Sequence, residues 1–360
     1  MNTVKNAVRI GIDLGKNVFH LFGVDDAGDP LLKKKLTRKQ LLPYLANLEP
    51  CCIGLEACGG SNYWAREIRS LGHDIRLMSP QFVKPYVKSN KNDYNDAEAI
   101  CEAVGRPTMR FVAVKTVEQQ DVQALHRIRQ SIVKARTAQA NQIRGLLGEY
   151  GIVIPAGIAN LRRHIPALLE DAENGLTARF RIWLSDLYRE LRALDERVQR
   201  CTREVLVLFR ADEACQRIGA IEGVGPQTAT ALVSAYGQAR EFSNGRQFSA
   251  SLGLVPRQHS TGGKPRLLGI SKRGDTYLRT LLIHGARSVV HHAAHKSDPR
   301  SQWIQRLVAD RGTNRAAVAL ANKNARVVWA LLSKGDEYRG GAHRSKWSSR
   351  PNIHPAAPQV

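Results

Sequence analysis

The chain has 360 residues, and 43% of them are hydrophobic, which is enough for two or three globular domains with apolar cores. Its 54 Lys and Arg outnumber 32 Asp and Glu, and the formal net charge of +22 indicates a polyanionic partner, with nucleic acid as the leading candidate. The sequence has no apolar run of about 18 residues and no signal-peptide pattern before Asp13, so it excludes a membrane-spanning protein and predicts a cytoplasmic one.

The distribution of charge indicates where nucleic acid binds, and the cysteines indicate the redox state of the compartment. From Ser251 onward there are 19 Lys and Arg against 5 Asp and Glu, so we expect the heaviest nucleic-acid contacts toward the C-terminal end. The six cysteines form no C-x-x-C pair and have no histidines at zinc-finger spacing. They are therefore predicted to be buried thiols in a reducing compartment.

The first hundred residues predict a mixed sheet with helices. Apolar runs and alternation indicate two hairpin strands, a third strand after a polar turn, and a buried central strand that ends in Glu56. Another short strand and two helices complete the pattern. The expected segments are strands at 8–13, 18–24, 51–55 and 75–78, and helices at 39–48 and 63–71.

A polar stretch, Lys91–Ile100, carries two aspartates where a helix is expected to begin. Asn92 is a plausible N-cap, and the small and apolar residues that follow favour helix, so Asp93 and Asp96 should project from one face of its first turns. Two carboxylates on one face suit a divalent metal. For an isolated pair, however, the more common explanation is that acidic residues favour a helix N-terminus.

Two further acids, Asp13 and Glu56, favour the metal site over a simple preference for the helix N-terminus. Asp13 and Glu56 end strands, and together with Asp93 and Asp96 they match the arrangement of an RNase H-like nuclease fold. Four carboxylates that converge on about two Mg²⁺ (or Mn²⁺) ions roughly 4 Å apart suit phosphoryl transfer, because one metal activates the attacking oxygen and the other stabilises the leaving one.

The middle of the chain predicts two long amphipathic helices. From Val117 onward Gly and Pro vanish until Gly145, and apolar residues recur at steps of three and four. A second seam keeps the same stepping over about three and a half heptads, which is a coiled-coil signal. The seams are Leu125, Ile128, Ile132 and Ala135, then Leu184, Leu187, Leu191, Leu194, Val198, Cys201, Val205 and Leu208. Periodicity does not separate packing within a chain from pairing between chains; we expect a role in assembly.

The segment Ile221–Pro226, followed by a helix over 227–235, resembles a helix-hairpin-helix DNA-binding element. Gly223 and Gly225 would let backbone N–H groups approach a phosphate, and the helix N-terminus would add a positive dipole. Such contact is independent of base sequence. The alternative is an ordinary connection between two helices.

A second focal stretch, Gly253–Asp275, places hydroxyl groups in a glycine-flanked loop among cations. Ser260 could attack a phosphodiester if neighbouring cations stabilised the transition state. On composition alone, a loop that only binds phosphate is the safer reading. The side chains expected to contact nucleic acid are Arg257, Thr261, Lys264, Arg266, Lys272 and Arg273.

The end of the chain carries less information. Histidines on the helix after Asp275 lack the glutamate of a zinc motif and more often contact phosphate or solvent than zinc. Helical periodicity resumes over 316–332. From Gly335 the composition turns to Gly, Arg, Ser and Pro, which predicts a disordered or nucleic-acid-contacting tail.

Three acidic segments carry a family resemblance. Ile10–Asp13, Gly54–Gly59 and Lys91–Ala97 resemble the DEDD motif of the insertion-sequence 110 family of bacterial transposases, in particular its 1111 subgroup, and all four acidic positions are met. The resemblance implies a RuvC-like N-terminal domain, a coiled coil that supports a multimeric complex, and a C-terminal domain whose serine links covalently to DNA. Ser260 is the expected nucleophile, although a register shift of one residue would select Thr261.

The expected organisation has four parts. These are a RuvC-like domain at 1–115, a helical coiled-coil region at 116–212, a mostly helical transposase domain at 213–334 and a basic tail at 335–360. The resemblance implies strand cleavage and exchange on DNA at element ends and target, in a dimer or tetramer in the bacterial cytoplasm, guided by a structured bridge RNA. The alternatives are a metal-only RuvC-like nuclease that uses water, or a non-catalytic nucleic-acid-binding protein.

Overall fold

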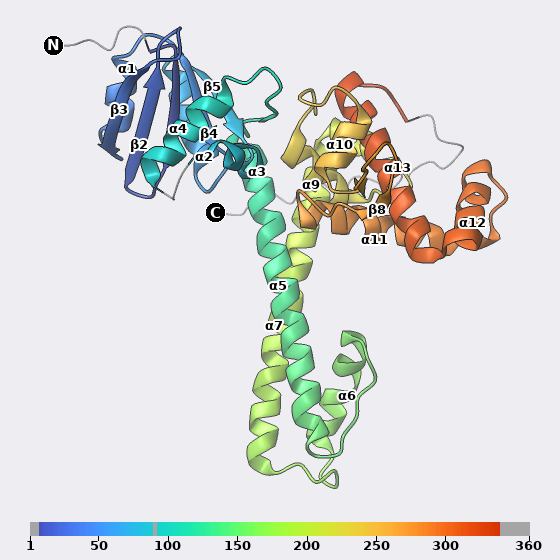
Figure 1. Cartoon of the computed structure of the whole chain (residues 1–360). Helices are drawn as coiled ribbons and strands as arrows, with labels where there is room; N and C mark the ends of the chain where they lie inside the picture. Colours follow the sequence, from blue (N-terminus) through green and yellow to red (C-terminus); the bar gives the residue numbers. More distant parts are fainter. Residues whose placement is uncertain (1–6, 89–91, 339–360) are drawn as a thin grey trace. The chain divides into compact units, whose positions relative to one another are not determined.

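The computed structural model describes residues 7–88 and 92–338. The chain divides into two compact units, Met1–Val117 and Glu118–Val360 (Figure 1). Lys91 and most of the predicted tail 335–360 lie outside the described residues. None of the described helices is both long enough and apolar enough to cross a membrane.

The first unit is built on a six-stranded sheet with the order β3-β2-β1-β4-β5-β6. β1, β4 and β5 are mutually parallel, while β2, β3 and β6 each run antiparallel to a neighbour. The strands are β1 (Arg9–Leu14), β2 (Val18–Val24), β3 (Pro30–Thr37), β4 (Cys52–Glu56), β5 (Asp74–Met78) and β6 (Phe111–Val112). The predicted mixed α/β organisation of this region is confirmed.

One face of this sheet packs against α1 (Leu41–Ala46) and α2 (Ser61–Ser70) around a core that includes Ile10, Ile12 and Trp64. Alternate strand residues point to opposite faces, so these isoleucines turn away from Gly11 and Asp13. The helix expected over 39–48 is shorter, because the Gln40 side chain accepts a hydrogen bond from the Thr37 amide in a turn before α1. Two short helices follow β5, α3 (Pro80–Val83) and the 3₁₀ helix η1 (Lys84–Tyr86).

The opposite face is covered by α4 (Asp93–Val104). The predicted N-cap is confirmed: the Asn92 side chain accepts a hydrogen bond from the Tyr94 amide at 3.1 Å. The helix lies so close to β1 that a Cβ on Gly11 would come within 2.2 Å of the Ala97 carbonyl oxygen. Glycine at position 11 is therefore a packing requirement, and it sets where the start of α4 lies over the sheet.

The second unit begins with a long helical hairpin. α5 (Val117–Gly148) and α7 (Ala178–Ala211) run antiparallel and side by side, with α6 (Ile158–Glu170) near their far end (Figure 1). Buried Ile132 packs with Val198 and Cys201, so the two seams meet within one chain. The inclusion of Ile128 in the first seam was wrong, since its side chain is 51% exposed. Ala135 is exposed as well, because the inward stripe follows Ile132, Ala140 and Ile143.

The rest of this unit is a helical body with its own apolar core. α13 runs through that core, with Leu320 and Val328 fully buried. The helices are α8 (Glu213–Gly219), α9 (Pro226–Tyr236), α10 (Gly245–Ser251), α11 (Thr276–His292), the 3₁₀ helix η2 (Ala293–His295), α12 (Pro299–Arg311) and α13 (Thr313–Lys334). The division of this unit into an assembly region at 116–212 and a transposase domain at 213–334 stays a prediction.

A buried charge cluster lies within the hairpin. Asp195 on α7 is only 6% exposed, and its carboxylate lies 3.0 Å from Arg136 of α5 and 2.8 Å from Arg162 of α6. One carboxylate thus joins three helices, and its removal would leave two guanidinium groups without their partner.

We predict that Asp195→Ala lowers the free energy of unfolding by about 3 kcal/mol, because it leaves partly buried cations uncompensated. Urea denaturation followed by circular dichroism measures the change. The matched control is Asp186→Ala on the same helix, where an exposed pair with Arg189 should contribute less than about 1 kcal/mol. Equal losses in the two variants would contradict the prediction.

Candidate metal centre and serine hairpin

Two of the predicted acids lie at the carboxyl ends of neighbouring parallel strands: Glu56 is the last residue of β4, and Asp13 is the last but one of β1. The β1–β4 register pairs Ile12 with Leu55, and one step further along the same register come Asp13 and Glu56. Because Ile12 and Leu55 belong to the core on one face, the two acids turn toward the face that α4 covers. The pairing of β1 with β4 therefore brings both acids to the carboxyl ends of these strands, on the same face of the sheet.

The helix supplies the other two acids. Asp93 and Asp96 lie in the first turn of α4, and Asp13, Asp93 and Asp96 each offer a carboxylate oxygen within 4.8 Å of the others. Asp93 is the most exposed, while Asp13 and Asp96 are half-buried. Among the described residues Glu56 is not a member of this group, although it lies on the adjacent strand.

The group suits a hard divalent cation. Carboxylates this close repel one another unless a cation lies among them, and oxygen ligands are those that Mg²⁺ and Mn²⁺ prefer. The negative charge of these acids also acts on the thiol of Cys58. The pKa of Cys58 is raised, first by burial of its sulfur and then by the charges of Glu56 and Asp13. Cys58 was wrongly grouped with the buried thiols; Cys51, Cys101, Cys201 and Cys215 are buried.

His20 is a residue at this centre that the sequence did not single out. It pairs with Asp13 across β1 and β2, and its Nδ1 lies 3.6 Å from an Asp93 carboxylate oxygen. The ring is buried and stacks edge-on against Tyr94 at 4.7 Å between centroids. The alternation of β2 puts His20 on the polar face, but only the strand register reveals which acid it meets.

The predicted serine loop is a β-hairpin. Strands β7 (Pro256–Gln258) and β8 (Leu267–Ile270) pair antiparallel, and the chain reverses between Thr261 and Lys264. Gly262 and Gly263 have φ values of +55° and +74°, which a two-residue hairpin turn of type I′ requires. Ser260 therefore lies on the first arm of the hairpin, directly before the four-residue turn that runs from Thr261 to Lys264.

Ser260 and Thr261 are both exposed, as are all the cations predicted around them. The Ser260 hydroxyl accepts hydrogen bonds from Gln258 Nε2 at 2.9 Å and from the Arg266 amide at 3.3 Å. Within the described part of the chain, no histidine or carboxylate is recorded in contact with this hydroxyl. The hairpin thus presents an exposed hydroxyl among positive charges, an arrangement that can bind phosphate.

The two ends of the hairpin are tied together by close backbone contact and one buried arginine. A Cβ on Gly253 would lie 2.2 Å from the Arg273 carbonyl oxygen. Arg279 of α11, which is 8% exposed, donates to the carbonyl oxygens of Leu252 and Arg273 at 3.2 and 3.0 Å. A charged donor therefore joins the residue before the hairpin to the residue after it.

We predict that Arg279→Met speeds amide hydrogen exchange at Ser271 and Lys272 by about tenfold or more, because each hydrogen bond from a charged group contributes about 1.5–3 kcal/mol. These amides donate to the carbonyl oxygens of Val255 and Gly253 at the hairpin stem. The control is Arg287→Met, an exposed arginine on the same helix. Unchanged exchange at the stem would refute the role of Arg279.

The predicted helix-hairpin-helix segment connects α8 to α9. Gly223 has a φ of +88° and packs against Gly285 of α11, where a Cβ on Gly285 would lie 1.8 Å from the Gly223 carbonyl oxygen. Gly225 precedes α9, and the space beside it is open. Of the two glycines, Gly225 is thus the one whose surroundings leave room for a phosphate.

Comparison with known proteins gives two family matches in separate regions. A model for DEDD transposases of IS110, described as "Transposase", matches residues 10–152. A second model, described as "Transposase IS116/IS110/IS902 family", matches residues 215–302. The first match includes all four predicted acids, and the second includes the serine hairpin.

Full-length relatives agree with these matches. The chain is 52% identical to a Pseudomonas aeruginosa protein named "Probable family 20 transposase", over 93% of this chain and all of the relative. It is 48% identical to the "Transposase for insertion sequence element IS1111A" of Coxiella burnetii, over 94% and 93% of the two chains. It is 43% identical to the IS1328 transposase of Yersinia enterocolitica, over 92% and 98%.

These relatives show that the protein is a transposase, an enzyme of DNA recombination. Its positive charge and its cluster of carboxylates agree with that class of protein. It belongs to the IS110 family of insertion-sequence transposases. DNA is accordingly the substrate class that the family implies.

Proposed function

We propose that this transposase cleaves and exchanges DNA strands with a divalent metal held by an RNase H-like domain and with Ser260 as nucleophile. The observation that carries the proposal is the convergence of Asp13, Asp93 and Asp96 from β1 and α4 within 4.8 Å. Three carboxylates this close repel one another unless a cation lies among them, and the net charge of +22 separately favours a polyanion as the partner of the chain.

The acids would hold Mg²⁺ or Mn²⁺, with Glu56 on the adjacent strand as the fourth ligand of the DEDD set. A bound ion would supply positive charge to the scissile phosphate and to the oxygen that leaves. The His20 ring would hold the Asp93 carboxylate in its ligating orientation, as groups next to metal ligands commonly do.

We predict that Asp96→Asn weakens Mn²⁺ binding by at least about tenfold, because it removes a charged ligand from the group. Electron paramagnetic resonance of Mn²⁺ titrated into the protein without DNA measures this directly. Asp26→Asn, at an exposed acid in the turn after β2, is the charge-matched control and should bind Mn²⁺ as the wild type does. Wild-type binding in both variants would rule out the metal site.

In the serine step, Ser260 Oγ attacks the phosphorus of a DNA phosphodiester. A new bond forms between that oxygen and phosphorus, the bond to one DNA oxygen breaks, and the departing oxygen takes up a proton while the serine proton passes to solvent. The exposed cations of the hairpin, Arg257, Lys264 and Arg266, would stabilise charge on the phosphorane-like transition state. The hydroxyl group at a second DNA end then attacks the same phosphorus, the bond between phosphorus and Ser260 Oγ breaks, the attacking hydroxyl gives its proton to solvent, and the serine oxygen takes a proton up, which completes the exchange.

We predict a covalent protein–DNA adduct that survives denaturing electrophoresis in the wild type and is lost in Ser260→Ala. Thr261→Ala, one residue nearer the turn, should retain it. An adduct that persists in Ser260→Ala but disappears in Thr261→Ala would move the nucleophile to Thr261.

Two other outcomes favour the alternative functions. Metal-dependent cleavage without any adduct would indicate a RuvC-like nuclease that uses water. Unchanged activity in Asp93→Asn would indicate a protein whose acids have no catalytic role.

We further propose that the protein works as a homo-oligomer, dimer or tetramer, with a structured guide RNA. The support is the concentration of positive charge from Ser251 onward and the family resemblance. A discrete RNA among the nucleic acids that co-purify with the protein would establish the guide.

A further inference from the structure

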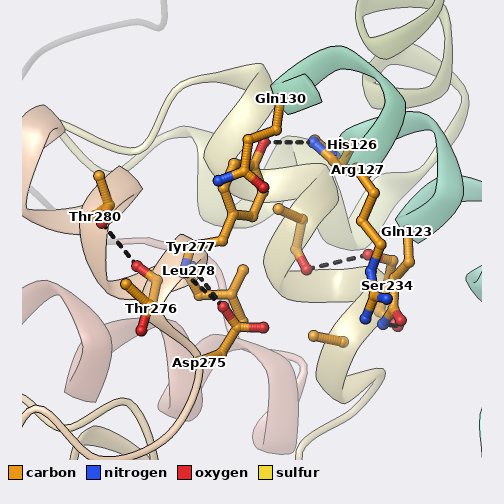
Figure 2. A pocket seen from close by; sticks show the side chains of 12 residues that line it. Gln123, His126, Arg127, Gln130, Ser234, Asp275, Thr276, Tyr277, Leu278 and Thr280 are labelled. Atoms are coloured by element: carbon orange, nitrogen blue, oxygen red, sulfur yellow. Dashed lines mark hydrogen bonds between the residues drawn. The ribbon is translucent and has the colours of Figure 1, made fainter. Parts of the chain in front are cut away.

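A pocket of about 450 Å³ opens within the second unit, among α5, α9 and the start of α11 (Figure 2). This volume falls in the range of small-ligand sites, about 300–1,000 Å³. Figure 2 shows that its wall comes from three separate segments, around Gln123–Gln130, Ala231–Ala235 and Asp275–Thr280. None of these residues was singled out as a binding residue from the sequence or takes part in the proposed chemistry.

The inner wall is a fixed network of hydrogen bonds. Thr230 Oγ1 donates to the Pro226 carbonyl oxygen at 2.8 Å, so it must accept from His126 Nε2, which lies 3.0 Å away. His126 Nδ1 then accepts from the Tyr277 hydroxyl at 3.0 Å, and that hydroxyl accepts in turn from Gln227 Nε2 at 3.1 Å. The network holds the two wall residues His126 and Tyr277 in place through Thr230 and Gln227 behind them.

Burial keeps this part of the wall uncharged. Burial, and then the charge of Arg129, lower the pKa of His126 to about 4, so the ring is neutral at physiological pH. Burial also raises the pKa of Tyr277, and its proton is already committed to His126. Tyr277 is therefore a wall residue and a poor nucleophile.

The pocket is also unsuited to a phosphate. Asp275 caps α11 by accepting hydrogen bonds from the amides of Tyr277 and Leu278, at 2.7 and 3.1 Å, so the helix N-terminus is already occupied by a carboxylate. Arg127 is the single Lys or Arg among the lining residues, and Asp275 is the single acid, so the formal charges of the lining sum to zero. A neutral ligand is thus favoured over an anion.

The remaining lining favours a flat ligand with polar edges. Ala231, Ala235 and Leu278 form an apolar part, and the Gln130 amide supplies a donor and an acceptor. The Gln123 amide nitrogen already donates to the Ser234 carbonyl oxygen at 2.9 Å, and the Thr280 hydroxyl donates to the Thr276 carbonyl oxygen at 2.7 Å, so these two side chains add acceptors. A nucleobase has this combination of an apolar face and a hydrogen-bonding edge. Lys272 and Arg273, exposed just before Asp275, would hold the phosphates of the same strand outside the pocket.

We propose that this pocket receives one unstacked nucleobase from a single-stranded segment of the nucleic acid that the transposase handles. The inference rests on the nucleic-acid binding within the proposed function, but on neither the metal nor Ser260. An unstacked base held here would fix the register of the strand close to the serine hairpin.

The test is photocrosslinking with the full-length Ser260→Ala protein in EDTA, so that no cleavage interferes. Short single strands of DNA and of RNA, each carrying 5-iodouracil or 8-azidoadenine, are irradiated with the protein, and the adducts are mapped by mass spectrometry. We expect adducts on the segments at 123–130 and 275–280. Adducts with DNA alone, RNA alone or both identify the source of the base.

Two variants test the pocket itself. Ala235→Trp, which fills it, should lower the yield of pocket adducts by about tenfold, and Gln130→Ala should lower it about three- to tenfold through loss of an edge hydrogen bond. Gln130 is on the exposed rim, so its substitution keeps the test valid if Ala235→Trp melts early. Gln142→Ala, an exposed glutamine further along α5, is the control and should leave the yield unchanged.

Other results would overturn the inference. Adducts confined to residues outside the pocket, or pocket adducts unaffected by both variants, would contradict it while leaving the proposed function intact. Failure of the protein to bind either kind of strand would overturn the inference, and failure to bind double-stranded DNA as well would overturn the proposed function.

Discussion

The close contact between α4 and β1 is the constraint on which the candidate metal centre depends. Gly11 leaves no room for a side chain beneath Ala97, and Gly54 on β4 is similarly crowded by Val104. Because the helix rests directly on the strands, its first turn comes to the carboxyl end of β1, where Asp13 is the last residue but one. A larger residue at position 11 would lift the helix and separate the acids, although it touches none of them.

In the second unit, contacts at the stem hold the exposed hairpin of β7 and β8 in place. The hairpin itself buries little, so its order comes from the stem, where glycines allow backbone contact and Arg279 joins the two ends. The same region carries the neutral network of His126 and Tyr277, which connects α5, α9 and the start of α11. Supports of this kind would hold the hairpin in place for the proposed attack of Ser260.

Local signals in the sequence were sufficient for much of this fold. Asn92 as an N-cap, the strand ends at Asp13 and Glu56, and the helix after Pro226 follow from nearest neighbours in the chain. The second seam was also right for Val198 and Cys201, but Ile128 is exposed, because a stepping pattern does not reveal how a long helix rotates against its partner. His20 was missed because cross-strand partners depend on register, which two isolated strands do not encode.

The sequence by itself determined the family and the enzyme class, since the acidic motif segments and the strong positive charge are properties of composition and order, and the relatives confirm the transposase family. Only the tertiary structure decided that Asp13, Asp93 and Asp96 meet while Glu56 stands beside them, and that the two long helices pack within one chain. It also showed that the serine loop is a β-hairpin and that a pocket opens among α5, α9 and the start of α11. The physical reason is that distances between residues far apart in the chain are set by packing, which no local pattern specifies.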